Sequence, residues 1–201
     1  MARPATIFPA APSGRMRPLP ARARPFPVPL PISASGHQVA PGADFVWFVY
    51  GSSLDREAFH AWAAEHGYAL PDASRAFPAR LDGWRLAFDV ASRYWGGAVG
   101  SLVPGAGRSV EGLALPMPGA ARGLADHKEG AVSGLYRPQP VEVTPLAAGP
   151  PVAAVAYLAN PDRRLPAEEP PAAAWLEAVV RGARASGLSP GWIAELERLR
   201  R

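Results

Sequence analysis

Cysteine is absent from the 201-residue chain, and lysine occurs once, at Lys128. Without cysteine the chain has no disulfide framework, no thiolate zinc site and no cysteine nucleophile. Its one lysine lies outside any Gly-x-x-x-x-Gly-Lys-Ser/Thr sequence, which excludes a phosphate-binding loop of that type. The longest apolar runs are far shorter than the ~20 residues that span a bilayer, so we expect no membrane association.

Several catalytic and cofactor motifs are also missing. No window contains the Gly-x-Ser-x-Gly elbow of serine hydrolases. A dinucleotide-binding fingerprint that began at Gly105 would need glycine at position 110, where Val110 stands. The four histidines do not form a metal site, since His60 and His66 point to different faces of a predicted helix. We therefore expect no metal and no cofactor, and interpret each histidine as an ordinary surface or half-buried residue.

Acidic residues are absent from residues 1–43, which hold five arginines and ten of the 25 prolines. The other 158 residues carry 16 basic and 17 acidic side chains, so the formal net charge of +4 originates in this segment. Proline removes backbone N–H donors and favours polyproline II, so residues 1–43 are predicted to be a disordered Pro/Arg-rich tail. The prolines interrupt every candidate secretory signal or amphipathic presequence, which favours a cytoplasmic protein.

The tail has several interpretations. It could be a solvated extension without a role, a basic binding arm, a proline-rich ligand for a partner, or the product of a start codon assigned too early, with Met16 as one later candidate. Nucleic-acid binding through its arginines would weaken steeply with salt. The rest of the chain shows no basic groove interleaved with aromatic residues, so we expect no nucleic-acid partner.

Residues 44–201 are predicted to form one α+β domain. Residues 45–50 are continuously apolar, which indicates a strand buried on both faces. Gly51 ends this strand, and a helix is expected over residues 54–65, with Ser52 and Asp55 as a capping box. Further strands are predicted over residues 80–90, 98–103, 109–115, 135–143 and 152–158, with residues 104–107 (Pro-Gly-Ala-Gly) as a hairpin turn. Further helices are predicted over residues 120–128, 171–187 and 190–201.

The first candidate functional feature is the loop from Tyr50 to Leu54, which reads Tyr-Gly-Ser-Ser-Leu. A glycine-led turn at a helix N-terminus presents free backbone N–H groups and the positive end of the helix dipole. This arrangement suits a carboxylate, a phosphate or an oxyanion, and the small serines leave room for a ligand. The alternative is a plain helix start with a serine cap.

The second candidate is Glu129, which follows three ionisable side chains at the predicted end of the 120–128 helix. A carboxylate at a helix C-terminus is disfavoured by the dipole, which raises its proton affinity and suits a general base. The alternative is a solvated charged loop.

The order of several segments resembles the γ-glutamylcyclotransferase-like family. These segments are Phe-Val-Tyr-Gly-Ser-Ser-Leu at residues 48–54, Tyr-Trp-Gly-Gly-Ala-Val at 94–99, Lys-Glu-Gly at 128–130, Gly-Leu-Tyr at 134–136 and Gly-Ala-Arg-Ala-Ser-Gly-Leu at 182–188. That family shows a Tyr-Gly-Ser-Asn-Met/Leu loop, a Trp-Gly-Gly segment, a Glu-Gly pair before Gly-x-Tyr and a C-terminal Gly-Ala-x-x-x-Gly-Leu-Pro. The resemblance covers about residues 45–199.

The resemblance implies a small mixed barrel-like sheet flanked by helices, with the substrate at the barrel mouth. The implied activity is cofactor-independent cyclisation of a γ-glutamyl amino acid, peptide such as glutathione, or amine. It gives 5-oxoproline and a free amine or amino acid. By similarity the catalytic glutamate is Glu129. By the same similarity the residues that bind the substrate are Tyr50, Gly51, Ser52, Ser53 and Leu54.

Two positions depart from the family pattern. Ser53 stands where the family usually has asparagine, which bears on substrate choice, and Glu111 replaces a large apolar residue at the sheet surface or a substrate wall. Tyr136 and Tyr157 match family tyrosines that either line the pocket or pack in the core. The alternative function is a non-catalytic protein that binds a γ-glutamyl or other carboxylate ligand in the same pocket. The sequence assigns neither a leaving group nor an oligomeric state.

Overall fold

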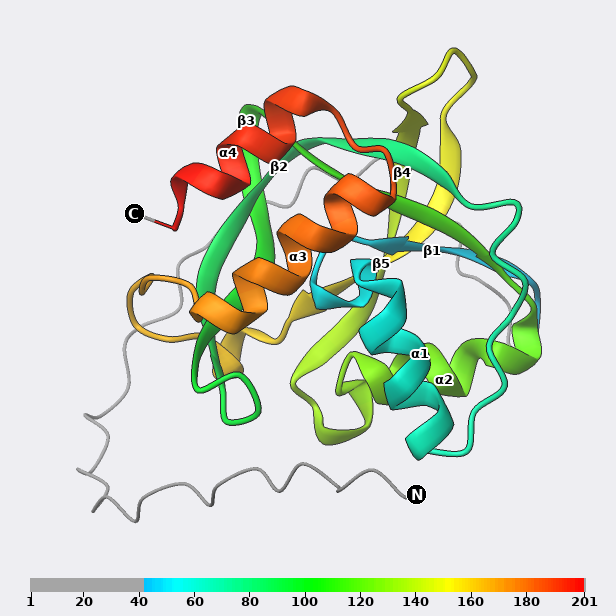
Figure 1. Ribbon diagram of the computed structural model, residues 1–201, viewed down its shortest axis with the longest axis horizontal. Helices are drawn as coiled ribbons and strands as arrows, with labels where there is room; N and C mark the ends of the chain where they lie inside the picture. The colour runs from blue at the N-terminus through cyan, green and yellow to red at the C-terminus, as the bar shows by residue number, and fades with distance from the viewer. Residues whose placement is uncertain (1–41, 201) are drawn as a thin grey trace, which may run out of the picture.

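The computed structural model describes residues 42–200, so nearly all of the predicted tail over residues 1–43 lies outside the described residues. Within them, five strands close into a barrel in the order β1-β3-β2-β4-β5 (Figure 1). The strands are β1 (Phe45–Val49), β2 (Phe77–Ser92), β3 (Gly97–Met117), β4 (Tyr136–Pro145) and β5 (Val152–Ala159). Neighbouring strands are antiparallel except β1 and β5, which pair in parallel at Trp47 and Val155. The predicted α+β fold with a small mixed barrel-like sheet is therefore confirmed.

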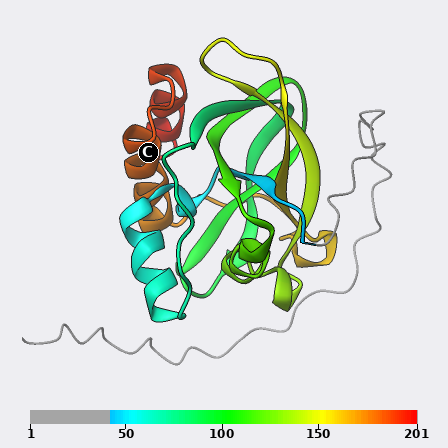
Figure 2. The ribbon, with the colours of Figure 1, turned by 90° about the vertical axis from the view of Figure 1, so that its right-hand side faces the viewer.

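Helices cover one side and one end of this barrel. They are α1 (Arg56–Glu65), α2 (Arg122–Lys128), α3 (Ala173–Ala185) and α4 (Pro190–Arg198). Figure 2 shows α1, α3 and α4 along one side, with α2 below the barrel in that view. Each helix falls within or close to a range predicted from the sequence. None of the helices within residues 42–200 has the length and apolarity needed to cross a membrane.

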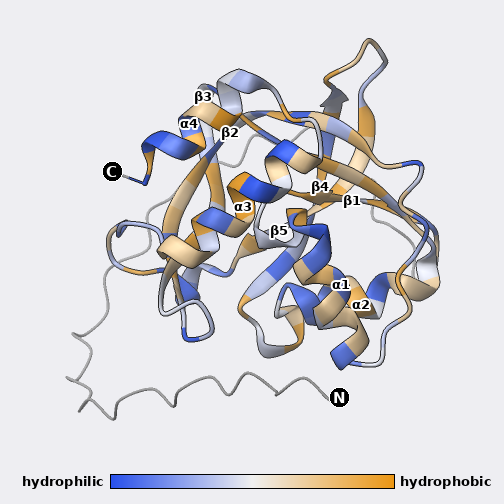
Figure 3. Ribbon diagram, in the orientation of Figure 1, coloured by the Kyte–Doolittle hydropathy of each residue, from blue (hydrophilic) through white to orange (hydrophobic). Residues whose placement is uncertain are grey.

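Helix α3 shows how the apolar pattern directs packing. Trp175, Val179 and Ala183 share a helical face and are almost completely buried against the barrel, as their spacing predicts. Gly187 follows the helix with a φ of +69°, and the N–H of Leu188 donates to the carbonyl of Ala183. This is the glycine-based helix end expected from the sequence. Figure 3 shows hydrophilic positions alternating with the apolar ones along α3 and α4.

The hairpin predicted at residues 104–107 is wrong. The chain turns instead at residues 93–96, and β3 runs unbroken through Pro104, which pairs with Trp84 of β2. The register slips so that residues 105–108 stand opposite Gly83 alone, which forms a bulge. Glycine and proline mark bulges as well as turns, and a long strand that bends around a small barrel needs such irregularities.

The loop after β1 is held by α3 through a close backbone approach. A Cβ atom on Gly182 would lie 2.3 Å from the carbonyl carbon of Leu54 and 2.4 Å from the nitrogen of Asp55, so only glycine fits there. The buried Asp55 carboxylate forms an ion pair with Arg181 of α3 and accepts a hydrogen bond from the N–H of Ala58. Asp55 is thus the N-cap of α1, which corrects the predicted Ser52 capping box.

Candidate active site

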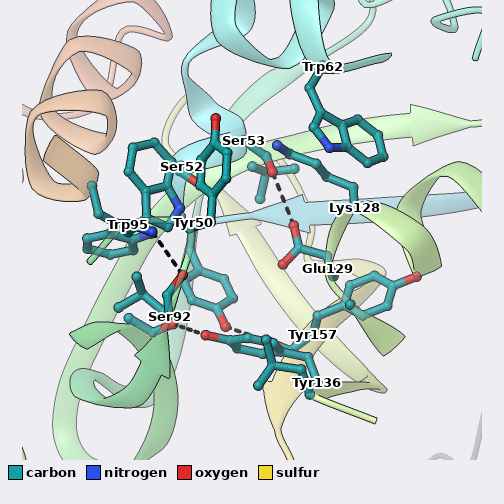
Figure 4. A pocket seen from close by; sticks show the side chains of 18 of the residues that line it. Tyr50, Ser52, Ser53, Trp62, Ser92, Trp95, Lys128, Glu129, Tyr136 and Tyr157 are labelled. Atoms are coloured by element: carbon teal, nitrogen blue, oxygen red, sulfur yellow. Dashed lines mark hydrogen bonds between the residues drawn. The ribbon is translucent and has the colours of Figure 1, made fainter. Parts of the chain in front are cut away.

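A pocket of about 300 Å³ opens where three segments meet at one end of the barrel (Figure 4). These segments are the loop after β1, the end of α2 with the residues that follow it, and the β2–β3 turn. The pocket brings Glu129 together with Tyr50, Gly51, Ser52 and Ser53, all of which were predicted from the sequence to form the site. Its volume is at the lower end of the range for small-molecule sites.

Glu129 is the C-cap residue of α2, and its backbone N–H donates to the carbonyl of Ala125 over 3.0 Å. Gly130 follows with a φ of +65°, which reverses the chain directly after the glutamate. The hydroxyl of Ser53 donates to Oε1 of Glu129 over 3.2 Å, although 76 positions separate the two residues. The end of α2 and the loop after β1 are thus joined at the carboxylate.

Burial raises the pKa of Glu129 from 4.5 to about 7. The positive charge of Lys128 and the hydrogen bond from Ser53 lower this pKa, but they offset only part of the desolvation. The sequence predicted a raised proton affinity from the helix dipole, whereas burial is the main cause in the structure. A carboxylate with a pKa near neutrality can both accept and return a proton at physiological pH.

The loop after β1 supplies backbone donors beside this carboxylate. Its own turns use the N–H of Leu54, which donates to Gly51, and the N–H of Asp55, which donates to Ser52. Among residues 42–200, the N–H groups of Gly51, Ser52 and Ser53 have no backbone acceptor, so they are available to a bound anion. Leu54, which was also predicted to bind substrate, is instead fully buried away from the pocket and anchors the loop in the core.

Three tyrosines line the pocket and also contribute to the core. Tyr50 donates its hydroxyl proton to the carbonyl of Tyr157 over 2.5 Å, and Tyr136 donates to the carbonyl of Gly100 over 2.7 Å. Tyr157 in turn donates to the carboxylate of Asp126. Burial raises the pKa of all three phenols, so they stay protonated and hold the shape of the pocket.

The β2–β3 turn forms another part of the pocket wall. The N–H of Trp95 donates to Oγ of Ser92, which fixes the turn, and Tyr94 stands against Trp95 with an exposed fraction of 83%. The Trp-Gly-Gly segment predicted by resemblance therefore borders the site. Glu111, by contrast, lies outside the pocket, where its carboxylate accepts hydrogen bonds from the N–H and hydroxyl of Ser189 at the start of α4.

Sequence reasoning missed several residues of the pocket wall, among them Trp62 and Lys128. In the sequence, Trp62 has the spacing from Phe59 that is typical of an apolar helix face packed in the core, and Lys128 belongs to a run of ionisable side chains. The signal that could have found Lys128 is its position next to the candidate base as the one lysine of the chain. Within residues 42–200, no group of three or more histidine, aspartate and glutamate side chains is placed to hold a metal ion.

Comparison with known proteins finds a family model that matches part of the chain and solved structures with a similar fold. Residues 109–196, which include Glu129, match the model of the AIG2-like family. A structure of a γ-glutamyl cyclotransferase is 24% identical, with a TM-score of 0.62 and coverage of 77% of this chain and 86% of that one. A human protein described as uncharacterized gives the same four values. No curated protein sequence matches the chain.

A third structure, YkqA from Bacillus subtilis, is 24% identical, with a TM-score of 0.65 and coverage of 78% of this chain and 54% of that one. This chain therefore spans about half the length of YkqA. Together the AIG2-like segment and the shared fold confirm the family resemblance that the sequence predicts.

Proposed function

We propose that this γ-glutamylcyclotransferase-like protein converts a γ-glutamyl amide into 5-oxoproline and a free amine or amino acid. The α-amine of the substrate attacks its own γ-carbonyl carbon, and the bond from that carbon to the leaving nitrogen breaks. The observation that carries the proposal is Glu129, a pocket carboxylate with a pKa raised to about 7 that lies beside the free N–H groups of residues 51–53.

Orientation supplies much of the rate enhancement in such a reaction. Nucleophile and electrophile belong to one molecule, so the pocket has only to hold the glutamyl chain in the folded conformation that precedes a five-membered ring. Well-oriented intramolecular reactions gain roughly 7–11 kcal/mol over bimolecular ones. The buried tyrosines and the small volume of the pocket favour such a folded substrate.

Glu129 serves as the general base and then as the general acid. The substrate amine arrives as an ammonium, and the carboxylate accepts a proton from it so that the nitrogen lone pair can attack. The protonated glutamate then returns a proton to the leaving nitrogen, and a free ammonium forms on the released product, so the protons balance overall. General acid–base catalysis of this kind contributes about 10²–10⁴-fold.

The N–H groups of Gly51, Ser52 and Ser53 supply the anion-binding part of the site. They are suited to the α-carboxylate of the glutamyl group or to the oxyanion that develops on the γ-carbonyl. The loss of one oxyanion donor typically lowers the rate by about 10²–10³-fold. The ion pair between Asp55 and Arg181, together with the close contact at Gly182, keeps these donors in place.

The test is detection of 5-oxoproline by mass spectrometry with the wild type and Glu129→Gln. The substrates are γ-glutamyl amino acids, γ-glutamyl amines and glutathione. We expect product from the wild type and at least ~10²-fold less from the variant, because glutamine cannot accept the proton. Equal product from both proteins would remove Glu129 from this role. Tight binding of γ-glutamyl ligands without product would support the non-catalytic alternative.

A further inference from the structure

Lys128 is a cation on the pocket wall that forms no ion pair with a carboxylate among residues 42–200. It is half-buried at the end of α2, next to Glu129 in the chain, and Figure 4 shows it extending from α2 toward the Ser52–Ser53 loop. Within residues 42–200 it takes part in none of the eight salt bridges and donates no side-chain hydrogen bond. Its three N–H donors are therefore available to a ligand.

An aromatic stack fixes the position of this charge. Nζ of Lys128 lies 4.8 Å from the centre of the Trp62 ring, and that ring stacks on His66 at 4.4 Å and on Tyr68 at 5.9 Å. His127 meets the same ring edge-on at 5.2 Å. A cation–π contact is weaker than a charge-assisted hydrogen bond, so the stack positions the ammonium without satisfying its donors.

The other polar groups of the pocket already match the glutamyl half of a substrate. The free N–H groups of residues 51–53 suit its α-carboxylate, and Glu129 accepts a proton from its amine. The leaving nitrogen must also contact Glu129, which returns a proton to it. In an α-amino acid leaving group, the carboxylate is attached to the carbon next to that nitrogen. Lys128, adjacent to Glu129, is the free cation of the described pocket wall that such a carboxylate can meet.

We propose that Lys128 is the specificity-determining residue for the leaving group, and that it selects γ-glutamyl conjugates whose leaving group carries a carboxylate. The inference rests on the proposed cyclotransferase function and extends it to a substrate class. γ-Glutamyl α-amino acids and peptides with a nearby carboxylate are then preferred over γ-glutamyl amines. Burial lowers the pKa of Lys128, and the negative charge of the neighbouring Glu129 offsets only part of this effect.

The experiment compares kcat/KM for γ-glutamyl-alanine and γ-glutamyl-ethylamide, which differ only in the carboxylate on the leaving amine. Lys128→Met keeps the apolar stem against Trp62 and removes the charge. We expect about 10- to 100-fold lower kcat/KM on γ-glutamyl-alanine, the range for a lost hydrogen bond to a charged group, and a change below about 2-fold on the ethylamide. Lys128→Arg should restore much of the preference.

Two controls isolate the effect of the contact. Arg108 of β3 lies outside the pocket and forms a salt bridge with Glu195 of α4. Arg108→Gln removes this positive charge and should leave the ratio of kcat/KM for the two substrates unchanged. All values are taken on the alkaline plateau of the pH profile, because Lys128 also lowers the pKa of Glu129. Equal losses on both substrates, or no loss on either, would overturn the proposal.

A binding measurement separates this proposal from the reaction itself. Calorimetry with Glu129→Gln and with Glu129→Gln combined with Lys128→Met measures the affinity for the same two compounds without relying on turnover. A preference for γ-glutamyl-alanine that disappears with the lysine supports the role of Lys128 even where the wild type forms no 5-oxoproline. Equal affinities for the two compounds in both proteins would refute it.

Discussion

Replacing Glu129 with glutamine tests whether burial sets the proton affinity of this carboxylate, independently of any substrate. Its pKa is about 7 in the folded chain, against 4.5 for an unperturbed glutamate. Between these two values the folded state holds a proton at this site that the unfolded state has released. Stability therefore falls as the pH rises from about 4.5 to about 7, and levels off above.

The size of this fall follows from the difference between the two pKa values. One pKa unit corresponds to 1.36 kcal/mol, so the rise to about 7 makes the folded protein about 3 kcal/mol less stable at high pH. Glutamine has the shape of the protonated acid, and its amide oxygen can still accept the hydrogen bond from Ser53. We expect Glu129→Gln and the wild type to be similarly stable near pH 4.5 and the variant to be about 3 kcal/mol more stable at pH 8.

The assay is denaturant unfolding of both full-length proteins at half-unit steps from pH 4.5 to 8.5. The difference between the two free energies of unfolding cancels every other titrating group. The height of the plateau in this difference gives the separation of the folded and unfolded pKa values of Glu129, and the midpoint of the change gives their mean. Parallel curves, with no pH-dependent difference, would show that the carboxylate is solvated and that the reasoning from burial is wrong.

Two further predictions concern turnover and the support of the loop. The kcat/KM of the wild type should rise with pH to a plateau, with a midpoint near the Glu129 pKa of about 7, because only the ionised carboxylate accepts a proton. The measurement is steady-state turnover from pH 5 to 9, and a flat pH profile would contradict this prediction. Gly182→Ala should lower stability by about 1–3 kcal/mol and reduce kcat/KM, since its Cβ would meet the backbone of Leu54 and Asp55. Gly191→Ala, where the nearest atom lies 3.8 Å away, is the matched control for unfolding and turnover, and equal effects of the two variants would refute the contact.

Local patterns predicted the elements of the site better than their assembly. The apolar run before Gly51 became β1, and Gly130 ended the helix that carries Glu129. These features depend on neighbours in the chain. The hydrogen bond from Ser53 to Glu129 joins residues 76 positions apart, and no local pattern encodes it. Only the family resemblance placed the two residues in one site before the structure did.

The predictions failed where contacts between distant parts of the chain determine the local structure. Pro104 and its neighbours have turn composition, yet the pairing of β2 with β3 makes them a bulge. Long-range geometry also determines the surroundings of Asp89, whose buried carboxylate accepts a hydrogen bond from Ser101 over 2.5 Å and forms an ion pair with Arg164, 75 positions away. The sequence shows three separate polar residues there, and only the closed barrel brings them together.

The proton affinity of Glu129 depends on a balance between burial, which raises its pKa, and the hydrogen bond from the loop after β1, which lowers it. A fully solvated carboxylate has a pKa near 4.5 and is a weak base, whereas two or three strong donors would lower its pKa further still. Ser53 supplies one hydrogen bond of 3.2 Å, enough to orient the carboxylate while burial continues to dominate its pKa. The resulting loss of stability at high pH and the ability to take a proton near neutrality have one physical origin. A substitution at Ser53 that adds donors should therefore stabilise the fold at high pH and slow proton transfer at the same time.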